Sequence, residues 1–112
     1  MPTSPRPLLV LTTCASADEA ERLAASLVEQ RLAACVNTLG RVQSTYRWQG
    51  RVEREQESLL VIKTTEARLA KVEQAIRERS SNEVPEVLAI PVHGGSADYL
   101  GWLADSVAER KE

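Results

Sequence analysis

The sequence predicts an α+β fold, a ferredoxin-like split βαβ sandwich with a long β-hairpin and a further C-terminal helix. One observation is the order of segments, which is strand, helix, strand, strand, helix, strand, helix. Another is the length, because 112 residues suit a single domain. The third is a nearly unbroken strand–turn–strand from about Arg31 to Thr65. We expect one domain over residues 8–110, after a flexible, proline-rich lead of residues 1–7.

The first two elements are predicted from an apolar run and a helix start signal. Leu8 to Thr13 is apolar and partly β-branched, which is typical of a strand buried on both faces. Ser16 and Glu19 then have the spacing of a capping box. The helix that follows should end near Arg31. Its apolar residues are spaced three and four apart and should face the core: Ala20, Leu23, Ala24, Leu27 and Val28.

The hairpin is unusually long for a chain of this size. Gly50 at its midpoint can take the positive φ that a tight turn requires. Each arm has up to roughly 15 residues and would extend about 50 Å, whereas the usual strand has about 5–6 residues. The second arm is charged from Arg51 to Ser58 and apolar from Leu59 to Thr65, so it should begin outside the core and end inside it.

The last three elements follow from periodicity and breakers. A helix is expected over residues 66–79, and a polar turn follows at Ser80-Ser81-Asn82. A strand is expected over residues 84–92, at an edge or with prolines at its ends, because Pro85 and Pro91 cannot donate to a ladder. Ser96 should cap a final helix over residues 97–110.

Right-handed crossovers in this fold give the strand order four, one, three, two. The first arm of the hairpin is then an open edge, which proteins hide or pair. We therefore expect pairing with identical neighbours in a closed ring.

Composition and motifs exclude several classes of function. The net charge of −2 does not favour nucleic acid binding, and no apolar stretch is long enough to span a bilayer. Residues 8–11 are too short an apolar run for a signal peptide, so we expect a cytoplasmic protein with reduced cysteines. Neither a Walker loop nor a spacing from which a catalytic triad can be assembled is present, so we expect no enzymatic activity.

Three residues are candidate metal ligands. Cys35 and Cys14 lie in strands that the third strand separates, at least about 9–10 Å apart, which is too far for a disulfide. Each thiol is either a small buried apolar group or a ligand for a soft or borderline cation such as copper. His93 is either a solvated loop residue or a ligand.

Further candidates concern ligand binding and interfaces. Lys63 stands in an apolar run and needs a partner, for which Glu83 and Glu86 are candidates; alternatively it offers a charge to a ligand in an inter-subunit cleft. Tyr46 and Trp48 near the hairpin tip indicate a protein interface. Trp102 on the final helix joins this group.

Five segments in this order resemble the CutA divalent-cation-tolerance family over about residues 8–108. They are Glu29–Asn37 (EQRLAACVN), Tyr46–Gly50 (YRWQG), Ile62–Thr65 (IKTT), Glu83–Glu86 (EVPE) and Asp98–Leu103 (DYLGWL).

The resemblance implies a ferredoxin-like fold, a compact homotrimer similar to PII signalling proteins, and a cytoplasmic role in tolerance to copper and other divalent cations. It brings no established reaction. An alternative function is a PII-like sensor or scaffold that binds a small ligand or partner protein in inter-subunit clefts. One segment departs from the family, whose members commonly carry His-Pro-Tyr where this chain has Ser80-Ser81-Asn82. This departure argues against a metal site there.

Overall fold

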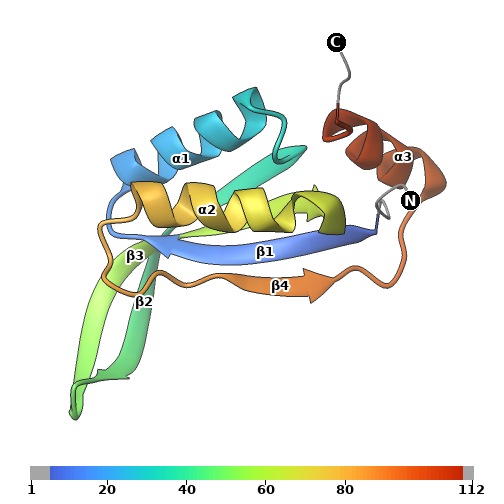
Figure 1. The fold of residues 1–112 in the computed structure, drawn as a ribbon. Coiled ribbons are helices and arrows are strands. Elements are labelled where there is room, and N and C mark those ends of the chain that lie inside the picture. The colour runs from blue at the N-terminus through green and yellow to red at the C-terminus, as the bar shows by residue number, and fades with distance from the viewer. Residues whose placement is uncertain (1–5, 110–112) are drawn as a thin grey trace.

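The computed structural model describes residues 6–109, and its element order is the one predicted from the sequence (Figure 1). A short 3₁₀ turn, Glu66–Arg68, precedes α2. The elements are β1 (Pro7–Cys14), α1 (Ala17–Glu29), β2 (Cys35–Trp48), β3 (Arg51–Thr65), α2 (Leu69–Arg79), β4 (Leu88–Pro91) and α3 (Ala97–Ser106).

The four strands form one antiparallel sheet in the order β2-β3-β1-β4, which confirms the predicted strand order and ferredoxin-like fold. Helices α1 and α2 cover one face of this sheet, whereas α3 lies beyond one end of β1 (Figure 1). Strand residues alternate accordingly, since Val10 and Ile62 are fully buried under the helices and their neighbours Leu9 and Val61 are only half-buried.

The hairpin closes with a two-residue turn. Gln49 and Gly50 have φ values of 51° and 80°, the combination of a type I′ turn, and Trp48 pairs with Arg51 across it. A bulge interrupts β2, because Leu39 pairs with Leu59 but Val42 pairs with Glu57. The bulge reverses the alternation in β2, so even-numbered residues after it share a face with odd-numbered residues before it.

The start of α1 differs in detail from the predicted capping box. The Ser16 hydroxyl accepts from the Glu19 N–H at 3.1 Å, as expected for the cap. The Glu19 carboxylate, however, accepts from the Ala15 N–H at 3.3 Å. Val28 was expected in the buried stripe but is 44% exposed, while Ser26 is buried. The prediction for Val28 is wrong because the buried stripe of α1 passes through Ser26 and Leu27 in the last turn and leaves Val28 outside it.

The predicted ends of the strands and helices differ most from the structure. Pro7 pairs with Thr65 within β1, so the predicted lead is one residue too long; residues 1–5 lie outside the described part. The fourth strand is only Leu88–Pro91, at the sheet edge, and pairs with Leu8 to Leu11 of β1. The final helix ends at Ser106, and residue 110 is outside the described range.

Candidate functional site

The sheet face opposite α1 and α2 carries apolar side chains that no element of residues 6–109 fully covers. We call it the open sheet face. Leu39, Leu88 and Ile90 on it are 47%, 55% and 43% exposed. Cross-strand register arranges the face in rows: Ile90, Leu9, Lys63 and Cys35; Leu88, Leu11, Val61 and Asn37; Thr13, Leu59 and Leu39. Exposed apolar patches mark protein or membrane interaction sites or ligand-binding grooves.

Lys63 lies at the end of the open sheet face that α3 borders. Its ammonium is 5.7 Å from the centroid of the Tyr99 ring, a cation–π distance. Tyr99 in turn packs at 5.4 Å, centroid to centroid, against Trp102, which is 48% exposed. Within residues 6–109, no carboxylate comes within 4.0 Å of the Lys63 ammonium.

The expected ion pair between Lys63 and Glu83 or Glu86 is therefore wrong. Both glutamates precede β4, whereas Lys63 shares its row with Ile90. The antiparallel register of β1 and β4 therefore keeps the two carboxylates at the other end of the sheet.

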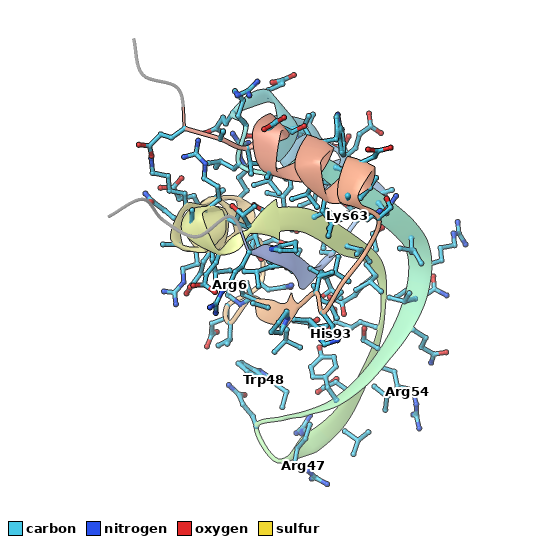
Figure 2. The ribbon with its side chains drawn as sticks, turned by 90° about the vertical axis from the view of Figure 1, so that its right-hand side faces the viewer. Arg6, Arg47, Trp48, Arg54, Lys63 and His93 are labelled. Carbon is cyan, nitrogen blue, oxygen red and sulfur yellow. The ribbon has the colours of Figure 1, made fainter. Side chains whose placement is uncertain are left out.

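Glu83 and Glu86 instead line an open acidic cleft of about 750 Å³ between the hairpin and the loop before β4. Tyr46 and Trp48 line the same cleft, so four of the sequence-predicted residues come together here. Figure 2 shows Trp48 on the inner side of the curved hairpin and Arg54 on its outer side. The Tyr46 hydroxyl donates to the Glu55 carboxylate, and this hydrogen bond raises the pKa of Tyr46 to about 12.

Three glutamates of this acidic cleft were not singled out from the sequence. Glu53, Glu55 and Glu57 alternate along β3 and therefore point to one face. The period of two was visible in the sequence, but the charged run was interpreted as a solvated strand face.

The loop that departs from the family pattern also lines the acidic cleft. The Ser81 hydroxyl donates to the Glu19 carboxylate at 2.8 Å, and the Asn82 N–H donates to the Ser80 hydroxyl at 3.0 Å. Two hydroxyl groups thus fix a turn that carries no metal-binding side chain.

The two cysteines are free thiols and lie far apart. Cys14 is opposite Ser58 and Cys35 is opposite Lys63, so they are separated by five residues along β3, about 16 Å. A single subunit therefore cannot place both on one metal ion.

Cys14 and Cys35 also differ in chemistry. Cys14 is buried, and burial, with Glu19 and Glu57 nearby, raises its pKa to about 11. Its thiol is protonated at neutral pH and so is a poor metal ligand. Cys35 is half-buried on the open sheet face.

His93 follows β4 and is exposed (Figure 2). Residues 6–109 contain no group of three or more His, Cys, Asp or Glu side chains arranged to hold a metal, so His93 and the cysteines form no such group within one subunit. The helices of residues 6–109 are also too short and too polar to cross a membrane.

Comparison with known proteins identifies relatives over nearly the whole chain. The family profile described as CutA1 divalent ion tolerance protein matches residues 8–106. The divalent-cation tolerance protein CutA of Thermus thermophilus is 42% identical over 98 residues, which cover 88% of this chain and 95% of that protein. The crystal structure of CutA1 from Oryza sativa superposes with a TM-score of 0.90 at 37% identity and covers 96% of this chain and 100% of that one.

Relatives differ in length. Protein CutA 1, chloroplastic, of Oryza sativa is 38% identical over 102 residues, which cover 91% of this chain but 58% of that protein. The chain thus spans a little over half of the length of this plant relative.

Proposed function

Because the chain belongs to the CutA1 divalent ion tolerance family, we propose that it acts in tolerance to divalent cations as a homotrimer without enzymatic activity. The observation that carries this proposal is the open sheet face, whose apolar rows are exposed in a single subunit. Such a surface is expected to be covered by protein. Identical subunits are the simplest source.

The two sheet edges favour a ring of subunits. β2 and β4 are the outer strands, so each subunit offers two different unpaired edges. Pairing the β2 edge of one subunit with the β4 edge of the next is a head-to-tail contact, which closes into a ring when the rotation per subunit permits. The projecting hairpin (Figure 1) would reach the neighbouring subunit. We propose three subunits on the basis of the family resemblance.

Copper is the cation we propose, with Cys35 as its main ligand. Cys35 is the less buried thiol, and thiolates suit copper among the available metals. Because one subunit supplies a single suitable thiolate, further ligands would come from neighbouring subunits. Cys14 and His93 remain secondary candidates.

Calorimetric titration with Cu²⁺, without reducing agent, tests the metal assignment. Cys35→Ser should weaken binding, whereas Cys14→Ser should bind as the parent does. His93→Ala is the third variant. Loss of copper binding in this variant alone would assign the site to the loop after β4. If Cys35→Ser binds copper as tightly as the parent, the thiolate assignment is wrong.

A second candidate function is a trimeric sensor or scaffold that binds a small anion or partner protein at inter-subunit clefts. The Lys63 ammonium favours it, since it faces Tyr99 and has no carboxylate partner within residues 6–109. A crystal structure with an anion beside Lys63 would support this function. A structure of the assembly in which Lys63 pairs only with a neighbour's carboxylate would contradict it.

We also propose a cytoplasmic location. Fractionation of cells that express the full chain, with detection by antibody, tests the proposal. Recovery in a membrane or extracellular fraction would overturn it.

A further inference from the structure

A second cleft, of about 480 Å³, lies among the helices and shares no residue with the open sheet face or the acidic cleft. It is bounded by the C-terminal end of α1, one side of α2 and the segment after α3. Most of the charged side chains that line it are cationic, namely Arg31, Arg68, Lys71 and Arg79. Two carboxylates, Glu78 and Glu109, also line it. We call it the basic cleft.

Main-chain carbonyl groups hold two of the three arginines of the basic cleft in place. Arg31 donates from Nη2 to the Asp105 carbonyl at 3.1 Å, and Arg68 donates from Nε to the Val107 carbonyl at 2.8 Å. Arg68 is 8% exposed. The guanidinium groups are therefore fixed before any ligand arrives, which reduces the ordering that binding requires.

These arginines retain unused hydrogen-bonding capacity. The Arg31 Nε is buried and has no acceptor among the described residues. A buried donor without an acceptor is rare and unfavourable. Arg68 has one ionic contact, at 3.7 Å, with Glu109, whose side chain is 81% exposed. An anion in the cleft would offer acceptors to the guanidinium groups that line it.

The other two cations extend this site. Lys71 and Arg79 are exposed, and within residues 6–109 neither has a carboxylate within 4.0 Å. Glu78 accepts from Gln74 at 3.0 Å, which occupies part of its capacity. Four cations against two carboxylates leave a net positive cleft that suits an anion with more than one charge.

We propose that the basic cleft binds a small, multiply charged oxyanion of the phosphate class. Guanidinium groups form paired hydrogen bonds with phosphate oxygens, and lysine adds a point charge. The volume of the cleft is within the range of small-molecule sites. None of its lining residues is in a strand, so covering the open sheet face does not by itself close the cleft.

Titration calorimetry with pyrophosphate at constant ionic strength tests the proposal. The parent should bind saturably, and the double variant Lys71→Gln/Arg79→Gln should bind at least about tenfold more weakly. Arg77→Gln is the matched control, because Arg77 lies on the same helix but pairs with Glu73 at 2.8 Å outside the cleft. Glu109→Gln should bind more tightly, since it removes the competing carboxylate.

Comparison with citrate tests whether the cleft prefers phosphate-class anions to carboxylates. The NMR resonance of an arginine in the cleft locates the bound anion. Citrate should bind more weakly than pyrophosphate, and equal or tighter citrate binding would overturn the phosphate assignment. The Nε–H resonance of Arg31, identified by its loss in Arg31→Gln, should shift on addition of pyrophosphate. Absence of saturable binding, or equal affinity in the parent and the double variant, would overturn the site itself.

Discussion

Lys63 lies directly opposite Cys35 in the β2–β3 ladder, and both side chains are on the open sheet face. The Lys63 ammonium turns to the Tyr99 ring of α3 rather than to a carboxylate. This arrangement places a cation, a half-buried thiol and two aromatic rings at one end of an apolar surface.

Replacement of Lys63 tests whether its charge is needed for folding. Lys63→Met keeps most of the aliphatic stem, and the lost cation–π contact is worth about 0.5–1 kcal/mol. We expect the free energy of unfolding, measured with urea at one protein concentration, to change by about 1 kcal/mol or less. A loss of about 3 kcal/mol or more would instead indicate a buried ion pair for Lys63.

Two adjacent residues of α1 provide a matched test of the core. Leu27 is fully buried and Val28 is 44% exposed. Leu27→Ala should destabilise the protein by about 2–5 kcal/mol through lost burial and a cavity. Val28→Ala should change stability much less, by about 0.5 kcal/mol in a single subunit. Thermal unfolding followed by circular dichroism compares them, and equal losses would contradict the described packing of α1.

Alanine at two glycines should have opposite effects. Gly50 has φ of 80° in the hairpin turn, so Gly50→Ala should destabilise by about 1 kcal/mol. Gly101 lies within α3, and a Cβ there would meet open space. Gly101→Ala should therefore stabilise by up to about 1 kcal/mol. Urea unfolding measures both changes, and stabilisation by Gly50→Ala would contradict the type I′ turn.

Cys14 should make stability depend on alkaline pH. Its pKa rises from 9.0 to about 11 in the folded protein, so the folded state favours the protonated thiol. The resulting stabilisation is present below about pH 9 and is lost as the pH rises toward 11. The stability difference between the parent and Cys14→Ala, measured over this range, should decrease with pH. Subtraction removes the effects of other groups, and a constant difference would contradict the raised pKa.

The sequence was sufficient for the elements whose signals are local. The Ser16 cap, the positive φ of Gly50 and the strand order each follow from short-range chemistry or from chain connectivity, and the structure confirms them. The bulge near Arg41 was not predicted, although it places Tyr46 and Trp48 on the same side of the sheet as the open sheet face. The isolated Gly40 within the strand is a local signal of a bulge, and it was not used in the prediction.

The candidate site was predicted less well, because side-chain partners depend on the register between strands. Lys63 was expected to meet Glu83 or Glu86, and the register places it in the row of Ile90 instead. The basic cleft was missed because Arg31 and Arg68 are 37 residues apart in the sequence and meet only through carbonyl groups at the end of α3. Contacts of this kind follow from tertiary packing rather than from spacing.

Sedimentation equilibrium on the full chain at micromolar concentration tests the central claim that identical subunits cover the open sheet face. We expect one species with the mass of three subunits. Leu88→Glu should disrupt that assembly by placing a charge on an exposed apolar row. A well-folded, stable single subunit in the parent protein would contradict the claim.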